Sequence, residues 1–398
     1  MPIPSGVETR LVIAKETAWG VKPLPTSGAL VRRSSITLDL SRDSFQSAEI
    51  ISTAQTQDMR LGSDKISGTL NAEMSCGTYK DLFAAAFRSS WFTGASLLAT
   101  TDIEFVAPNK IRRTAGSFIT DGFKIGTAID ITGATDPANY GRFVISDVTA
   151  LEVTVQVNIV NTLIVPFVAE AAGATVDIKT VGKLLIVPTT GRTNDSFSIE
   201  KFYNTINQSE LYTGVKISTI GFNFQPNAMA TLAFGLMGRA VESNTGPYFT
   251  TPVDNTLSSV LAGTKGSLFI GGQRIATVTG LTIDQTGNME VGQVIGDRQT
   301  PDVFLGRFTA SGQFTAYFED NVLWQKFRDE QELTITMKVD GDGAEGLLFT
   351  LPRVKLGGAS KDDKEVGGII QTVPFTALLY TGTGALHRTT MMLQDFSL

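Results

Sequence analysis

Few residues in this chain could support nucleophilic or metal chemistry. The 398 residues contain one histidine, His387, and one cysteine, Cys76, which lie far apart in the sequence. A Ser-His-Asp or Cys-His centre would have to use that single histidine, and a zinc site of Cys and His ligands needs more of both. We therefore predict that His387 packs or lies exposed without a catalytic role, and that the chain is not an enzyme.

Carboxylates in the segment VDGDGAEG, residues 339–346, are the best candidates for a metal site. Asp340, Asp342 and Glu345 lie among glycines as in a calcium loop, but the third alternate acidic ligand and the distant glutamate are missing. The segment also matches G-x-G-x-x-G, a fingerprint that requires a following helix. Strand-like runs, LTITMKV and LLFTLPRV, flank it instead, so the segment predicts a hairpin turn. We expect no metal and no cofactor.

Composition and charge narrow the class of protein. The chain is 42% apolar and 18% charged, which is typical of a globular protein with much buried surface. A net charge of −6 disfavours non-specific binding to nucleic-acid phosphates. One cysteine excludes an internal disulfide and is compatible with a reducing cytoplasm.

The apolar pattern alternates with a period of two over most of the chain, as in KISGTLNAEM, MATLAFGLMG and FTASGQFTAYF, and this predicts strands. Two short helices are expected in TYKDLFAAAFRSSW and DNVLWQKFRDE. Their predicted core-facing stripes are Tyr79, Leu82, Phe83 and Phe87 in the first helix and Leu323 and Phe327 in the second. The sequence therefore indicates a mainly β fold.

One stretch of the chain is spelled twice. QTQDMRLG at 55–62 returns as QTPDVFLG at 299–306, and at this spacing of 244 residues 44–83 and 288–327 share ten identities. The order of strand, long polar loop, strand and short helix recurs with them. Recurrence of the whole pattern in register indicates a duplicated β domain.

The two copies differ in length because the first is interrupted. Residues of about 98–182 have a different texture, with short strands at regular spacing and turn signals between them. We predict an inserted small all-β domain there, a sandwich or barrel. The first repeat then comprises 1–97 and 183–245, and the second repeat comprises 246–398.

A duplicated β domain without an active site suggests that both copies serve as structural building blocks of an assembly. Open sheet edges invite pairing with another chain, and a head-to-tail interface can close into a ring. The repeated motif lies in unusually long loops, 41–65 and 285–307, of the kind that often carry function. We predict that its residues make inter-subunit or inter-ring contacts: Gln55, Thr56, Asp58, Leu61 and Gly62, with Gln299, Thr300, Asp302, Leu305 and Gly306. Equally open is the interpretation that the glycines only set a turn and the leucines only fill a core.

Several separated segments resemble one known family. VIAKETAWGVKPLP, LVRRSSITLDLSRDSFQSAEI, FTAYFEDNVLWQKF and GGIIQTVPFTALLY, in this order, are similar to the tail tube protein of long-tailed bacteriophages. The resemblance implies two tandem tail-tube β-sandwich or barrel domains, each with a short flanking helix, with the insertion decorating the outside. It also implies trimeric rings of pseudo-sixfold symmetry that stack into a hollow tube.

By the same resemblance, the chain is expected to be a structural virion protein whose tube conducts double-stranded DNA without binding it specifically. The implied partners are further copies of the chain and the tape-measure, tail terminator and distal tail proteins. The implied location is the virion tail, and the host cytoplasm before assembly. A lumen that passes DNA should not be basic. Candidate lumen-facing acids are Asp39, Glu73, Asp284 and Glu319, for which solvated outer-face positions are an equal alternative.

The sequence also has features to compare with two other functions. A virion adhesin or decoration protein could bind host glycans through the insertion, but Trp19, Trp91 and Trp324 all lie outside it, which counts against this reading. A glycosidase with paired carboxylates is also conceivable, but the repeats show no recurring acidic pair.

Overall fold

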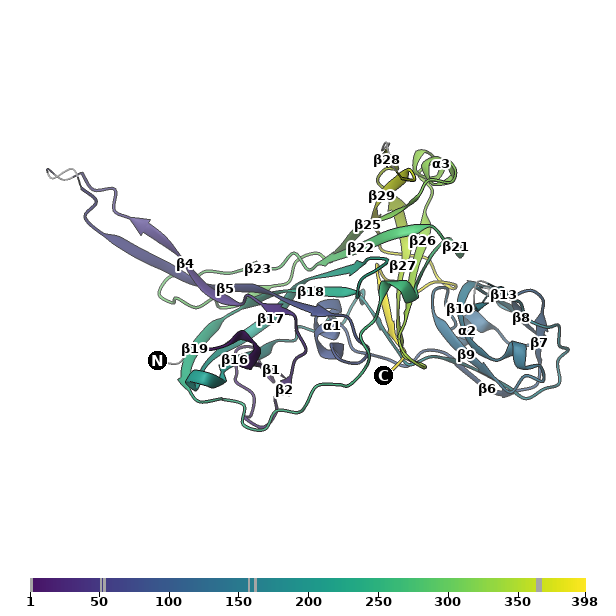
Figure 1. Ribbon diagram of the computed structural model, residues 1–398, viewed down its shortest axis with the longest axis horizontal. Helices are drawn as coiled ribbons and strands as arrows, with labels where there is room; N and C mark the ends of the chain where they lie inside the picture. The colour runs from purple at the N-terminus through teal and green to yellow at the C-terminus, as the bar shows by residue number, and fades with distance from the viewer. Residues whose placement is uncertain (1–2, 51, 53–54, 157, 161–162, 363–366) are drawn as a thin grey trace.

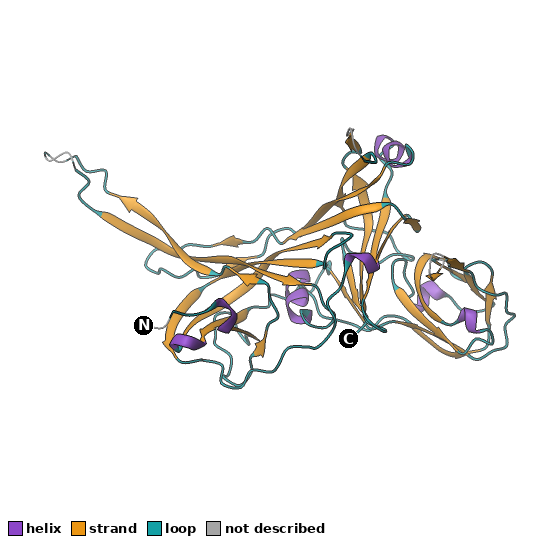
Figure 2. Ribbon diagram, in the orientation of Figure 1, coloured by secondary structure: helices purple, strands orange, loops and turns teal. Residues whose placement is uncertain are grey.

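The computed structural model describes residues 3–50, 52, 55–156, 158–160, 163–362 and 367–398. Figure 1 shows an elongated molecule with a central body, a long projecting hairpin and a separate lobe (Figure 1). Strands dominate all three parts and helices are few and short (Figure 2). The predicted mainly β fold is confirmed.

The first repeat wraps around one long strand, β17. Its elements are η1 Gly6–Glu8, β1 Thr9–Lys15, β2 Ala29–Leu30, β3 Ser35–Ile36, β4 Asp39–Gln46, β5 Met59–Glu73, α1 Lys80–Phe87, β15 Lys183–Ile186, β16 Phe197–Tyr203, η3 Asn204–Ile206, β17 Gln208–Phe224, β18 Thr231–Gly238 and β19 Ala240–Thr245. The early half of β17 pairs with β16 and β19, and its later half pairs with β18 and β22.

The second repeat repeats this plan with a shorter return. Its elements are η4 Gly263–Lys265, β20 Gly266–Ile270, β21 Gln273–Ile275, β22 Val278–Thr286, β23 Glu290–Val291, β24 Val303–Phe304, β25 Thr309–Tyr317, α3 Val322–Arg328, β26 Leu333–Asp340, β27 Gly346–Leu356, β28 Ser360–Asp362, β29 Ile370–Ala377 and β30 Met392–Asp395.

The projecting hairpin, residues 41–65, is called the arm. It was expected to be a loop, but its ends are paired strands: Ser41 lies opposite Lys65, and Gln46 lies opposite Met59. The polar sequence hid this pairing because every residue of β4 is exposed, so no apolar alternation marks it.

One continuous run of strands passes through both repeats. From β3 and β4 it continues through β5, β18, β17, β22, β25 and β29 to β28. The joint between the repeats is the antiparallel β17–β22 ladder, in which Thr219 lies opposite Thr286 and Phe224 opposite Leu281. Main-chain hydrogen bonds therefore hold the two repeats together.

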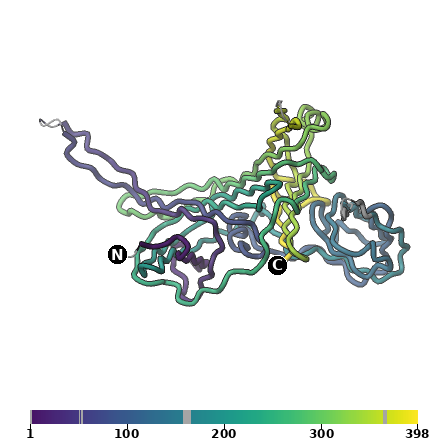
Figure 3. Tube along the Cα trace, in the orientation of Figure 1, coloured from purple at the N-terminus to yellow at the C-terminus, as the bar shows by residue number. Residues whose placement is uncertain are grey.

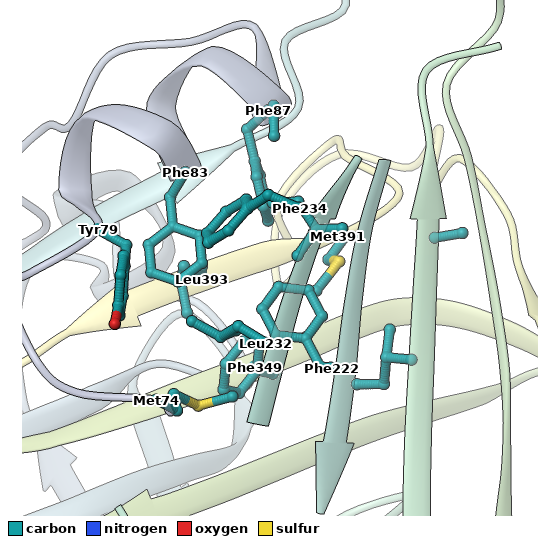
Figure 4. Packing of buried hydrophobic residues seen from close by; sticks show 14 of the residues in the cluster. Met74, Tyr79, Phe83, Phe87, Phe222, Leu232, Phe234, Phe349, Met391 and Leu393 are labelled. Carbon is teal, nitrogen blue, oxygen red and sulfur yellow. The ribbon is translucent and has the colours of Figure 1, made fainter. Parts of the chain in front are cut away.

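The core lies on one face of this run, where alternate side chains meet α1 (Figure 4). The Phe83 ring of α1 stacks on Phe222 at 6.1 Å between centroids, and Phe222 meets Phe349 of the second repeat edge-on at 4.9 Å. The predicted stripe of the first helix is confirmed, because all four of its members are buried. The predicted stripe of α3 is not confirmed, because Leu323 packs against the core whereas Phe327 remains 36% exposed.

The lobe, residues 96–180, has its own sheet and core. Its elements are β6 Ser96–Thr100, β7 Ile103–Val106, β8 Lys110–Arg113, α2 Phe118–Asp121, β9 Ala128–Thr132, η2 Pro137–Asn139, β10 Gly141–Val148, β11 Glu152–Val155, β12 Asn158–Val160, β13 Leu163–Val165 and β14 Val176–Thr180. The seven-stranded sheet has the order β6-β14-β9-β10-β11-β8-β7 around buried phenylalanines. The chain enters by β6 and leaves by its neighbour β14, with Thr180 N donating to Ala95 O at 2.8 Å.

A buried glutamine fastens the lobe to the body. The Gln394 side chain on β30 accepts from Ala128 N at 2.8 Å and donates to Ala128 O at 2.9 Å and Val181 O at 2.7 Å. The side chain is fully buried, so these three backbone groups have no access to water.

Replacing Gln394 with leucine should lower the free energy of unfolding by about 3 kcal/mol, because it leaves buried backbone groups of the lobe without partners. Urea unfolding measures the loss, and amide exchange at Ala128 locates it. The exposed Gln273 provides the matched control, since Gln273→Leu should change the stability by less than about 0.5 kcal/mol. Equal effects of the two substitutions would contradict the role assigned to Gln394.

Candidate functional site

The lone histidine and cysteine have packing roles. Burial, with a smaller effect of the Lys124 charge, lowers the pKa of His387 to about 4, and its ring meets Phe92 edge-on. Burial and the nearby Asp395 raise the pKa of the Cys76 thiol well above its ordinary value. A neutral, buried thiol is a poor nucleophile.

The acidic segment 339–346 forms the turn between β26 and β27. Asp340 pairs with Lys338 at 2.9 Å and Asp342 pairs with Lys265 at 2.6 Å, so lysines already neutralise these carboxylates. Across the part of the chain that the structure describes, no group of three or more His, Cys, Asp or Glu side chains could hold a metal ion.

The repeated motif has a different environment in each repeat. In the second repeat it belongs to residues 287–306, called the docked segment, which lies along the first repeat beside the base of the arm (Figure 3). Asp64 N of the arm donates to Arg298 O at 2.8 Å. The Thr300 hydroxyl donates to Gly292 O and Asp302 O, at 2.8 and 2.7 Å, and holds the segment folded on itself.

Lys216 of β17 anchors the centre of the docked segment. Its ammonium is 1% exposed, donates to Asp302 Oδ1 at 2.7 Å and to Val303 O at 2.8 Å, and lies 5.4 Å from the Trp19 ring. A buried ammonium is tolerated only with such partners. The Lys216–Asp302 pair therefore joins a strand of one repeat to the motif of the other.

Arg88 holds both ends of the docked segment. It follows α1 in the left-handed conformation, with φ of 56°, and its guanidinium is buried. Its Nη1 donates to Gly306 O and its Nη2 to Gly287 O, both at 2.7 Å. A Cβ at Gly306 would lie 1.8 Å from Asn288 O, so the repeated glycine is needed there for close approach of the backbone.

The same motif is bare on the arm. Thr300 is 2% exposed and Val303 fully buried, whereas their counterparts at a spacing of 244, Thr56 and Met59, are exposed, Met59 by 53%. The remaining members follow this pattern: Gln299, Asp302, Leu305 and Gly306 are partly buried, Gln55, Asp58 and Leu61 are exposed, and Gly62 is partly buried. In the second repeat, Asp302 therefore makes a contact within the same chain and Gly306 serves the close approach of the backbone. Contact of the motif with another subunit or ring stays a prediction.

The outer face of the central strands of the continuous run is polar and lacks cations. Small side chains such as Ser67, Asn71, Thr219 and Gln313 alternate with the buried ones. In β5 from Ser67 onward, β17 from Thr219 onward, β18, β22, β25 and β29, no lysine or arginine is present. This face therefore offers no positive charge to a phosphate backbone along those strands.

Three of the four predicted acids lie on this face. Asp39 begins β4, Glu73 ends β5, and Asp284 lies in β22 opposite Gly221. All three are exposed, and Asp39 approaches the Lys201 ammonium at 3.5 Å. Glu319 is exposed two residues beyond β25, outside the sheet.

Sequence reasoning missed Lys216 and Arg88. A weak signal existed for Lys216, because a single lysine interrupts the apolar run LYTGVKISTI. No local pattern marks Arg88, since its partners lie about 200 residues away in the sequence.

Comparison with known proteins gives one clear result. A family model described as phage tail tube protein matches residues 6–377. No curated protein matches the chain. In the described part of the chain, no helix is long and apolar enough to cross a membrane.

Asp302→Ala should lower the free energy of unfolding by about 3 kcal/mol, because it leaves a buried ammonium without its counter-charge. The matched control is Asp58→Ala at the repeat counterpart, which is exposed and should cost less than about 0.5 kcal/mol in the monomer. Urea unfolding at a concentration where sedimentation shows monomers compares the two. Similar losses would mean that the Lys216–Asp302 pair does not anchor the docked segment.

Proposed function

The chain belongs to the phage tail tube protein family, a family of structural tail proteins and not of enzymes, and we propose that three copies close into a ring and that rings stack into the hollow tube of a virion tail. Three chains place six repeats around the ring, which gives it pseudo-sixfold symmetry. The double-stranded genome passes along the lumen without specific binding.

The β17–β22 ladder carries this proposal. Inside one chain it joins the first repeat to the second, head to tail. The same run of strands ends on one side with β28, which pairs with β29. It ends on the other side with β3 and β4, which both pair with β5. In the second repeat β28 is the counterpart of β17, and in the first repeat β3 and β4 are the counterpart of β22. The β28 strand of one chain can therefore pair with β3 and β4 of the next chain as β17 pairs with β22 within the chain. A head-to-tail joint closes into a ring when its rotation divides a full turn, as a sixth of a turn at each of six joints does.

The ladders define which residues would meet. In the second repeat, Ser360 lies opposite Thr372, which in turn lies opposite Thr315. In the first repeat, Gly221 lies opposite Ala233, which in turn lies opposite Asn71, the counterpart of Thr315. Asp39 lies opposite Ser67, and Asp284 lies opposite Ser311, which is the repeat counterpart of Ser67. Since Gly221 pairs with Asp284 within the chain, Ser360 of one chain would pair with Asp39 of the next.

The cation-free face is suited to line the lumen. Binding to DNA is driven largely by cations that neutralise phosphates, so a wall without lysine or arginine lets a duplex slide. Asp39, Glu73 and Asp284 on this wall add repulsion. The ends of the tube would meet the tail terminator and distal tail proteins, and the tape-measure protein would lie inside. The lobe would decorate the outside, and the chain would remain in the host cytoplasm until assembly.

Negative-stain electron microscopy of the purified chain across a concentration series tests the ring. We expect rings or tubes whose averages have threefold symmetry with six similar inner features, and a lumen wide enough for a duplex of about 20 Å. Monomers at every concentration, in the presence of a tail-tip extract as initiator, would overturn the proposal.

Reversing two lumen charges tests the wall. Tubes of Glu73→Lys/Asp284→Lys should retain linear duplex DNA in a filter assay, with retention that falls as salt rises, whereas wild-type tubes should not. The control is Glu104→Lys/Asp147→Lys, which makes the same charge change at exposed positions of the lobe. Equal retention by both variants would show that Glu73 and Asp284 do not face the DNA path.

A further inference from the structure

The second repeat has a lysine at the position that Lys216 occupies in the first. Along the ladders, Lys216 lies opposite Met237, which lies opposite Ser67. Lys355 lies opposite Thr376, which lies opposite Ser311. Ser67 and Ser311 are repeat counterparts at the spacing of 244, so the two lysines occupy equivalent rungs.

The aspartates of this arrangement are also repeated, because Asp58 and Asp302 are counterparts in the motif. Asp302 meets Lys216 within the chain, whereas the partners that Asp58 and Lys355 have in the described part of the chain are local and exposed. Asp58 pairs with Arg60, two residues away, and Lys355 lies 3.3 Å from Glu330, whose side chain is 81% exposed. Exposed pairs of this kind contribute little free energy. One anion and one cation are thus available for a stronger contact.

Apolar side chains are exposed on the arm that carries Asp58 and on α3, which contacts the strand β27 that carries Lys355. On the arm, Phe45, Met59 and Leu61 are each more than half exposed. On the second repeat, Trp324 and Phe327 of α3 are exposed, although Phe83, the counterpart of Phe327, is 1% exposed in α1. Groups of exposed apolar side chains of this kind mark contact surfaces.

We propose that the arm of one chain docks on the second repeat of the next chain as the docked segment docks on the first repeat, with Lys355 Nζ donating to the Asp58 carboxylate. The partner is a second copy of this chain, and the proposal rests on the head-to-tail ring proposed above. Charge complementarity and burial of the exposed apolar side chains select this partner.

The two joints are not identical. At the spacing of 244 from Arg88 lies Glu332, which accepts from Arg353 Nη2 at 2.5 Å, and the residue that follows α3 as Arg88 follows α1 is Asp329. The arginine that holds the docked segment by two carbonyl groups therefore has no direct equivalent between chains. The Asp58–Lys355 pair and the apolar contacts carry the joint there, which leaves it weaker than the internal one and more sensitive to salt.

Charge reversal tests the pair. Lys355→Glu or Asp58→Lys should each raise the concentration needed for ring formation by at least about tenfold, because like charges would face each other at every joint between chains. The double variant Asp58→Lys/Lys355→Glu should restore assembly to within about threefold of wild type. Glu330→Gln is the matched control and should leave assembly unchanged, since it removes only the local partner of Lys355.

Zero-length carbodiimide coupling of wild-type rings gives a second measurement. Mass spectrometry should find an Asp58–Lys355 amide in rings, joining two chains, and none in monomers. Rings without this cross-link, or a double variant that stays impaired, would overturn the pair and leave the proposed ring intact. Absence of wild-type rings would overturn the proposed function, and this inference with it. Unfolding midpoints of the monomeric variants separate impaired assembly from impaired folding.

Discussion

Main-chain hydrogen bonding at the edges of an open sheet is the constraint on which the rest of this structure depends. A strand at an edge exposes a row of N–H and C=O groups, and a soluble protein must pair, cover or blunt that row. This chain pairs one such edge internally, through β17 and β22, and so turns two domains into one run of strands. The core, the docked segment and the position of α1 all depend on that joint.

Side chains add specificity to the joint that the backbone alone cannot provide. A β ladder can slip in register, and a slip would move every side chain to the opposite face. Lys216 and Arg88 prevent this because each is buried and its side chain donates hydrogen bonds to the docked segment at the correct register. Main-chain pairing thus supplies the attraction, and two buried cations fix the alignment.

The sequence predicted those features that repeat or alternate locally. The strands and the buried stripe of the first helix were visible because they leave a periodic signal. The paired strands of the arm were not visible, because every residue of β4 is exposed and the sequence therefore shows no apolar alternation there. The exposure of Phe327 was also missed, since a helical stripe reports which side is apolar and not whether a neighbour in the same chain covers it. Arg88 needed partners about 200 residues away, which no local pattern encodes.

The way in which the lobe is attached has a consequence for how such a chain can change. Its entry and exit strands, β6 and β14, are antiparallel neighbours, so the chain enters and leaves the lobe at two adjacent points. Any folded module whose ends lie side by side could occupy the same place without altering the path of the chain in either repeat. The site is therefore a natural point for genetic exchange of one folded module for another. An exchange would also remove the contacts between lobe and body, which include those around Gln394, the hydrogen bond from Thr350 Oγ1 to Gly126 O at 2.7 Å and that from Ile125 N to Ala385 O at 2.8 Å.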